Sequence, residues 1–286
     1  MTKRLIANIF LLLCLAQSSE PQQQRAFTKD MRFHHFHSEV MSQERSMLVM
    51  LPPGYDESAE KRYPVLYMHD GQSVSVNWRI DELAQPLFAN RQIEPIIFVA
   101  IFNGDTQEER FSDYTPTRDS RFAKSGNADG YGRMIIRELK PIVDAEYRTL
   151  ADQANTGIAG TSLGGLVSLY LALKYPATFG KVAVMSPSVW WDNRVIIRDV
   201  KSINSKPASR IWLDIGAQES SPSIADARLL RDALLAKGWK PDSDLRYFEA
   251  KGAEHSEKAF ARRAPEVLKY LFPGQGSAPT SQSNKP

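Results

Sequence analysis

The chain is nearly free of cysteine, because its 286 residues contain only Cys14. A single cysteine cannot form a disulfide within the chain, so no disulfide framework holds the fold. A chain of this length, with 42% hydrophobic residues, is long enough to bury a sizeable core instead. We therefore expect one globular domain whose stability rests on that core.

The chain also has little excess charge. Lysine and arginine number 36 against 33 aspartates and glutamates, which gives a formal net charge of +3. Lys3 and Arg4 belong to the N-terminal segment, and without them 34 basic residues face 33 acidic ones. Because the remainder is close to neutral, we expect no nucleic-acid partner.

Long hydrophobic runs are scarce, and the most conspicuous one spans residues 5–16. This run is too short to span a bilayer comfortably. Basic residues precede it and small residues follow it, which is typical of a secretory signal peptide over residues 1–19. We expect an exported protein, periplasmic or secreted, with no stable membrane insertion after cleavage. An uncleaved N-terminal anchor is the alternative.

Beyond this segment, short apolar runs alternate with stretches of helical periodicity. The apolar runs predict strands at residues 32–40, 46–51, 65–68, 96–102, 156–159, 181–185, 211–215 and 245–248. The helical stretches are residues 81–90, 131–147, 163–174, 224–237 and 256–271. This alternation predicts an α/β fold with a mostly parallel central sheet, helices on both faces and an antiparallel N-terminal hairpin.

Composition suggests the limits of the domain. Residues 20–30 form a polar, glutamine-rich linker, and residues 31–272 form the α/β domain. Residues 273–286 are rich in Gly, Ser, Pro and Gln and predict a disordered tail.

Ser162 is the strongest indication of function. It lies in the sequence Gly-Thr-Ser-Leu-Gly-Gly, residues 160–165, between a strand-like and a helix-like run. A strand that turns sharply into a helix exposes the central hydroxyl at the top of a sheet, and the glycines let the backbone pass close to itself. This pattern predicts the nucleophile elbow of a serine hydrolase. A glycine-rich turn with a capping serine is the alternative.

A nucleophilic serine needs a base and an acid to orient that base. In α/β-hydrolases the chain order is serine, acid, histidine, and His255 is the only histidine after Ser162. Glu219 follows the strand predicted at residues 211–215, whereas Asp214 lies within it. We favour Glu219 as the acid and keep Asp214 as the alternative.

The oxyanion of such a reaction needs two hydrogen-bond donors. The backbone N–H of Leu163, directly after the nucleophile, is the first candidate. The second is the N–H of Gln72, in the loop after the strand at residues 65–68, where Gly71 permits a close turn.

These motifs resemble the Putative esterase family of α/β-hydrolases, and the resemblance runs from about residue 33 to residue 272. This family includes enterochelin (siderophore) esterases, S-formylglutathione hydrolases, feruloyl esterases and mycolyltransferases. The resemblance is carried by residues 67–72, Arg110 with residues 113–116, residues 160–165, residues 186–191 and residues 252–255. It is greatest with the enterochelin-esterase branch. It implies an α/β-hydrolase fold in which Ser162, Glu219 and His255 match the nucleophile, acid and base.

The residues around the expected site suggest how a substrate is held. The polar stretch at residues 108–127 is rich in Arg, Asp and Tyr, as functional loops often are. We assign Arg110 and Tyr114 to substrate binding, although Arg110 can equally pair with an acidic residue at 108, 109 or 113. Trp190 and Trp191 are expected to stack on an aromatic or sugar ring, or to pack against the sheet.

The expected function is hydrolysis of a small-molecule carboxylic ester through an acyl-enzyme, with a siderophore ester as one candidate. No cofactor or metal is expected, because the chain has no HExxH motif and the pair His35 and His37 has no evident third ligand. The glycine run at residues 130–132 does not have the dinucleotide-binding spacing. An acyltransferase with the same triad and a non-catalytic binding protein on the same fold are the alternatives.

Overall fold

The computed structural model describes residues 28–104 and 106–275. The predicted signal peptide lies outside the described residues, as do most of the predicted linker and tail. At the C-terminal end, Pro273 forms a bridge with Ile93, and the Gly274 N–H donates to the carbonyl of Gln92 at 3.0 Å. The chain is therefore still paired with the domain at the first residues of the predicted tail.

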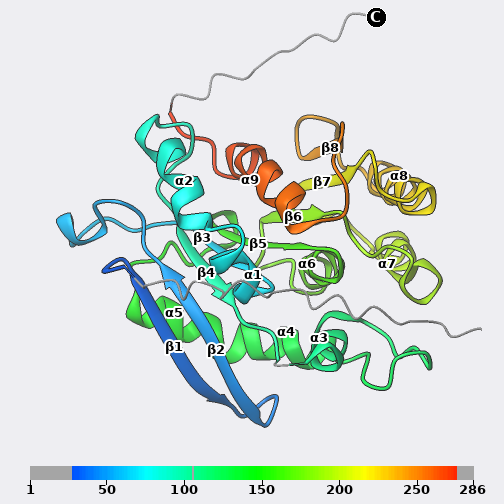
Figure 1. Cartoon of the computed structure of the whole chain (residues 1–286), viewed down its shortest axis with the longest axis horizontal. Helices are drawn as coiled ribbons and strands as arrows, with labels where there is room; N and C mark the ends of the chain where they lie inside the picture. The colour runs from blue at the N-terminus through cyan, green and yellow to red at the C-terminus, as the bar shows by residue number, and fades with distance from the viewer. Residues whose placement is uncertain (1–27, 105, 276–286) are drawn as a thin grey trace, which may run out of the picture.

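The described residues form one eight-stranded sheet with the order β1-β2-β4-β3-β5-β6-β7-β8. Its strands are β1 (Met31–Ser38), β2 (Gln43–Met50), β3 (Val65–Met68), β4 (Ile97–Ile101), β5 (Thr156–Thr161), β6 (Lys181–Met185), β7 (Arg210–Gly216) and β8 (Leu245–Ala250). Neighbours from β4 to β8 run parallel, whereas β2 is antiparallel to both β1 and β4. The N-terminal hairpin lies at one edge and β8 at the other (Figure 1). The predicted mostly parallel sheet with an antiparallel hairpin is confirmed.

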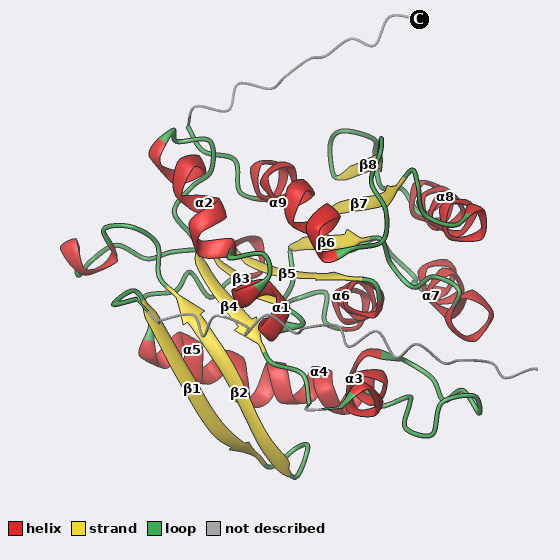
Figure 2. Ribbon diagram, viewed as in Figure 1, coloured by secondary structure: helices red, strands yellow, loops and turns green. Residues whose placement is uncertain are grey.

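Helices cover both faces of the sheet, as predicted (Figure 2). One face packs against α1 (Gly71–Val76), α2 (Ile80–Ala89) and α9 (Glu257–Leu271). The other face packs against α3 (Gln107–Tyr114), α4 (Ala128–Met134), α5 (Lys140–Glu146), α6 (Leu163–Lys174), α7 (Trp191–Ser202) and α8 (Ser221–Ala236). Strands β3, β4 and β5 are buried along their whole length, which explains their nearly continuous apolar sequences.

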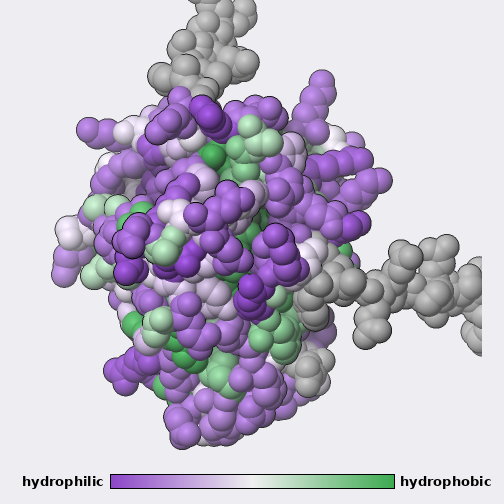
Figure 3. Space-filling model, turned by 90° about the vertical axis from the view of Figure 1, so that its left-hand side faces the viewer, coloured by the Kyte–Doolittle hydropathy of each residue, from purple (hydrophilic) through white to green (hydrophobic). Residues whose placement is uncertain are grey.

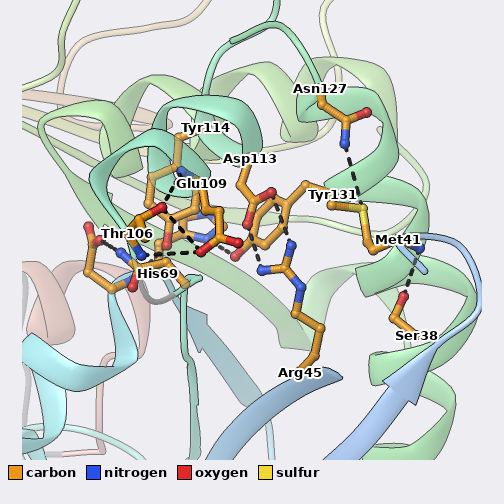
Figure 4. A network of polar contacts seen from close by, with 12 residues as sticks. Ser38, Met41, Arg45, His69, Thr106, Glu109, Asp113, Tyr114, Asn127 and Tyr131 are labelled. Carbon is orange, nitrogen blue, oxygen red and sulfur yellow. Dashed lines mark hydrogen bonds and ion pairs between the residues drawn. The ribbon is translucent and has the colours of Figure 1, made fainter. Parts of the chain in front are cut away.

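Three helices were missing from the sequence prediction: α1, α3 and α7. The stretch predicted as a polar loop begins with α3, where Thr106 and Glu109 form a capping box (Figure 4). The chain after Trp191 passes through left-handed conformations at residues 192–194, so the helical periodicity there is short. The helix predicted at residues 131–147 is α4 and α5 joined by a π-helical turn, Ile135–Leu139.

A buried ion pair ties α3 to the hairpin. Arg45 of β2 donates to both carboxylate oxygens of Asp113 at 2.6 and 3.1 Å, and both side chains are almost completely buried (Figure 4). Asp113 belongs to the stretch that resembles the esterase family, and here it anchors a helix rather than a ligand. This contact fixes the segment that carries Arg110 against β2 of the sheet.

The surface is mainly polar on the face seen in Figure 3, where hydrophobic residues gather in small patches between hydrophilic ones. Within the described part of the chain, no helix is both long and apolar enough to cross a membrane.

Candidate active site

Ser162 lies on a tight turn between β5 and α6. Its backbone has φ 57° and ψ −121°, a strained conformation for a residue with a side chain. The turn is closed by hydrogen bonds from the Ser162 N–H to the Met185 carbonyl and from the Ser188 N–H to the Ser162 carbonyl, both 3.0 Å. A Cβ at position 160 would lie 2.5 Å from the carbonyl carbon of Gly164, so only glycine fits there. This is the geometry of a nucleophile elbow.

The elbow opens onto a groove of about 1070 Å³ at the carboxyl ends of the parallel strands. Ser162 and His255 both line this groove, as do Gln72 and Arg110. The Ser162 hydroxyl is 3.3 Å from that of Ser188. Ligands of open α/β sheets bind at this end of the strands, so the groove is the candidate substrate site.

His255 is held by Glu219, which the structure brings to it from the loop after β7. The distance from His255 Nδ1 to Glu219 Oε2 is 2.7 Å. The Glu219 side chain is 3% exposed, whereas that of His255 is 46% exposed on the groove side. In a neutral ring this bond places the proton on Nδ1 and leaves Nε2 as an acceptor, which is the tautomer that a general base requires.

The other oxygen of Glu219 is also engaged. Its Oε1 accepts from the Ser186 hydroxyl at 2.5 Å and from the Gly216 N–H at 2.9 Å. Burial raises the pKa of Glu219, but the hydrogen bonds from its three partners outweigh that effect and hold the pKa below its usual range. Glu219 therefore stays ionised beside the histidine.

Asp214, the alternative acid, lies behind this pair and is fully buried at the end of β7. It accepts from the Trp212 indole N–H at 2.8 Å and forms an ion pair with Arg263 at 3.3 Å. Burial raises the pKa of Asp214 to about 6, against the opposing effect of Arg263. Arg263 also donates to the Ser186 hydroxyl at 2.8 Å, and the Ser186 N–H donates to Asp214 Oδ1 at 3.2 Å. Because the Ser186 hydroxyl donates to Glu219, Ser186 links the two carboxylates.

Sequence reasoning missed Ser186 and Arg263. Arg263 lies on α9 among buried apolar residues, namely Phe260, Ala264, Val267 and Leu268. A charged residue on an otherwise apolar helix face is the signal that was available. Ser186 lies in the stretch 186–191 that carries the family resemblance, but its contact with Glu219 had no signal of its own, because a serine after a strand is common in turns.

The two predicted oxyanion donors come from different elements. Leu163 is the first residue of α6, and Gln72 lies in the first turn of α1 rather than in a loop. N–H groups in the first turn of a helix have no intrahelical acceptor and favour negative charge. Gln72 lines the same groove as Ser162, and its side-chain amide donates to the Asn103 side chain at 2.6 Å.

Arg110 lines the groove, but its charge is already paired. It donates to both carboxylate oxygens of Asp70, from Nε at 2.6 Å and from Nη2 at 2.9 Å. None of the neighbouring acidic residues expected at 108, 109 or 113 is its partner. The Tyr114 side chain is fully buried, and its hydroxyl accepts the Asp70 N–H at 2.9 Å. The prediction that Tyr114 contacts substrate is therefore wrong, because its hydroxyl is turned into the protein.

The structure buries one of the two tryptophans and leaves the other partly exposed, and neither lines the groove. Trp191 is fully buried, packs against Phe111 and Phe122, and donates its indole N–H to the Thr117 carbonyl at 3.2 Å. It belongs to the core and not to a substrate site. Trp190 is 41% exposed, but it packs towards Phe122 and is not among the residues that line the groove.

His35 and His37 both contact Glu44 on the exposed hairpin. Across residues 28–104 and 106–275, no group of three or more His, Cys, Asp or Glu residues is arranged to hold a metal ion.

Comparison with known proteins places this chain in a family. The model of the family described as "Putative esterase" matches residues 38–267. The chain belongs to this family. Its fold is therefore that of an esterase family, as the sequence motifs suggested.

Three relatives show the range of the family. An uncharacterized protein, YbbA, of Bacillus subtilis is 27% identical over 248 residues, which are 82% of this chain and 95% of that protein. An endo-1,4-beta-xylanase/feruloyl esterase of Xylanibacter ruminicola is 26% identical over 83% of this chain and 30% of its own length. The iron(III) enterobactin esterase of Escherichia coli K12 is 30% identical over 57% of this chain and 40% of its own length.

Solved structures show the same fold. The enterobactin esterase of Shigella flexneri, crystallised in the presence of enterobactin, superposes with a TM-score of 0.73 at 20% identity. The match covers 84% of this chain and 58% of that one. At this identity the likeness establishes the α/β-hydrolase esterase fold.

Proposed function

We propose that this protein is an exported serine esterase that hydrolyses carboxylic esters through an acyl-enzyme at Ser162. The observation that carries the proposal is the arrangement around the groove. Ser162 lies on a strained elbow that opens onto the same groove as His255, and His255 Nδ1 is hydrogen-bonded to the buried Glu219. Nucleophile, base and acid follow the chain order of α/β-hydrolases.

In the proposed reaction, the Ser162 hydroxyl attacks the ester carbonyl carbon while His255 Nε2 takes its proton. The N–H groups of Leu163 and Gln72 donate to the oxyanion of the tetrahedral intermediate. His255 then gives the proton to the leaving alcohol, and the acyl group stays on Ser162. A water molecule repeats the sequence on the acyl-enzyme, releases the acid and restores the serine.

Glu219 supports both steps by electrostatics. Its pKa lies below the usual range, so it stays ionised while His255 takes up the serine proton and gives it to the leaving alcohol. An ionised carboxylate at 2.7 Å favours the imidazolium as it forms, and it fixes the orientation of the ring.

The groove favours esters that carry an aromatic group. One wall is apolar and includes Phe33 and Phe102, whose rings pack edge to face with centroids 5.7 Å apart. Phe33 is 50% exposed and Val76 is 41% exposed, so apolar surface is available to a ligand. Since relatives are named as feruloyl and enterobactin esterases, we propose feruloyl-type and siderophore-type esters as the substrates to test.

The activity is tested with a series of p-nitrophenyl esters on the mature protein. We expect Ser162→Ala and His255→Ala each to lower turnover by about 10⁴-fold or more, as in other triads. Ser162→Thr, which retains a hydroxyl on a more crowded carbon, serves as a conservative control and should retain a trace of activity. Full activity in Ser162→Ala would overturn the proposal.

Export rests on the N-terminal segment, which lies outside the described residues. We expect the exported protein to lack roughly its first 16 to 19 residues, because small residues follow the apolar run there. Intact-mass spectrometry of the secreted or periplasmic fraction measures this directly. A mass that still includes Met1 would contradict cleavage.

A further inference from the structure

We infer that Arg110 is a positioning residue for the oxyanion hole rather than a receptor for an acidic substrate group. It acts by clamping Asp70, which directly precedes α1 and the Gln72 N–H. This inference rests on the proposed function and goes beyond it, because it assigns to Arg110 and Asp70 a part in stabilising the transition state.

The backbone of Asp70 is strained. It has φ 54° and ψ 50°, in the left-handed region that favours glycine. A non-glycine residue stays in this region only when its surroundings hold it there, and such residues cluster at active sites. The conformation of Asp70 sets the direction in which α1 leaves β3, and with it the direction of the first N–H groups of that helix.

Three side chains hold Asp70 in place. Arg110 donates to both carboxylate oxygens at 2.6 and 2.9 Å, and the Asn103 amide donates to one of them at 2.8 Å. The hydroxyl of Tyr114 accepts the Asp70 N–H at 2.9 Å. Arg110 and Tyr114 come from α3 and Asn103 follows β4, so the residue is fixed from two elements. Figure 4 shows Tyr114 beside His69, which precedes Asp70 in the chain.

The turn at residues 70 and 71 packs closely against β4 and against the nucleophile elbow. A Cβ at position 71 would lie 2.8 Å from the carbonyl carbon of Ile101, and one at position 164 would lie 3.3 Å from Asp70 Oδ2. The Asp70 carboxylate therefore packs on the first turn of α6, which presents the Leu163 N–H. The clamp thus holds the two donor segments in one fixed relation.

Electrostatics argue against a role for Arg110 in binding an anion. Its side chain is only 18% exposed, and its Nε and Nη2 groups donate to Asp70 as a bidentate pair. Glu257 adds a second carboxylate to the lining of the groove. An acidic substrate group would have to displace the Asp70 carboxylate, which already forms two hydrogen bonds with the planar guanidinium.

The test measures kcat and KM for Arg110→Met, Arg110→Lys and Asp70→Asn on a neutral ester, p-nitrophenyl benzoate, and its anionic 4-carboxybenzoate analogue. We expect kcat to fall about 10- to 100-fold on both esters in Arg110→Met and Asp70→Asn, because a displaced donor stabilises the oxyanion less. KM should change by less than about 3-fold. Arg110→Lys should recover little, since an ammonium group cannot make both hydrogen bonds.

The Arg110→Met/Asp70→Asn double variant should lose no more kcat than the worse single variant, because the two residues act as a unit. Arg228→Met is the matched control, since Arg228 makes the same bidentate contact with Glu249 on α8 and β8, away from the groove. Thermal unfolding of every variant checks that the comparison is between folded proteins.

Two results would overturn the inference. One is a rise in KM confined to the anionic ester in Arg110→Met. The other is tighter binding of that ester in Asp70→Asn, because removal of the pair would then free an anion receptor. Both presuppose activity that depends on Ser162. The inference and the proposed function therefore fail on different results. The proposed function fails if Ser162→Ala keeps full activity.

Discussion

Asp214 and Glu219 show how local contacts give two neighbouring carboxylates different pKa values. Glu219 accepts three hydrogen bonds, one of them from His255, and its pKa lies below the usual range. Asp214 is fully buried and its pKa is raised to about 6. Only Glu219 contacts the histidine, so it is the carboxylate suited to orient His255.

Replacing each acid by its isosteric amide tests which of the two supports His255. We expect Glu219→Gln to lower kcat by about 10²- to 10⁴-fold, because the amide no longer stabilises the imidazolium or selects its tautomer. Asp214→Asn should cost much less than Glu219→Gln at the same fraction of folded protein. Steady-state ester hydrolysis, with circular dichroism to confirm folding, measures both. A larger loss in Asp214→Asn would reverse the assignment.

His69 makes stability depend on pH. Burial, with a smaller effect from Arg110, lowers the pKa of His69 to about 3 from an ordinary 6.5. Between pH 6.5 and pH 3, His69 is therefore protonated in the unfolded chain but neutral in the folded protein. The free energy of unfolding falls as the pH falls through this range. His69→Gln, which can still bond the Tyr131 hydroxyl, removes this effect.

We expect the cost of His69→Gln in the free energy of unfolding to be about 2 kcal/mol smaller at pH 5 than at pH 7.5. Urea unfolding of the unchanged protein and the variant at the two pH values isolates this difference, because the titration of all other groups is common to the two proteins and cancels. An equal cost at the two pH values would show that His69 is charged in the folded protein.

A topological rule indicated which single residues lie close together at the ends of the strands. Chain order and strand ends led to His255 and Glu219, which the structure brings together. The contacts of Arg110, Tyr114 and Trp191 could not be predicted in this way. Each depends on a partner distant in sequence or on burial, and neither is visible until the chain is folded.

Elements were predicted where periodicity is long. The core strands and α6 match closely, because buried strands are continuously apolar and α6 has twelve residues. Helices α1 and α3 have six and eight residues, and such short helices depend on caps and tertiary contacts. The Thr106–Glu109 capping box was the available signal for α3.

The attachment of α3 to the sheet is testable through the Arg45–Asp113 pair. Arg45→Met leaves a buried carboxylate unpaired, and we expect the free energy of unfolding to fall by about 3 to 5 kcal/mol. Arg45→Met/Asp113→Leu should recover much of this loss, because no charge then stays buried. Denaturant unfolding measures both. A double variant that is less stable than the single one would contradict this account.

On the scale of the whole molecule, the fold follows from the alternation of apolar and helical segments. The eight-stranded sheet, its N-terminal hairpin and the helices on both faces were all predictable from that alternation. The order of the strands was not, because β3 lies between β4 and β5 and sequence patterns do not state which strands pair. The parallel arrangement brings the ends of β5, β7 and β8 to one edge, and this assembles the site.

The most direct test of the account is to label the nucleophilic serine covalently. The protein is incubated with a fluorophosphonate, which reacts with activated serines, and the modified residue is identified by peptide mass spectrometry. We predict one phosphonyl group per chain, carried by Ser162, together with complete loss of ester hydrolysis. The same treatment of His255→Ala should label Ser162 far more slowly, because the base is absent. An inactivated enzyme labelled elsewhere, with Ser162 unmodified, would contradict the assignment of Ser162 as the nucleophile.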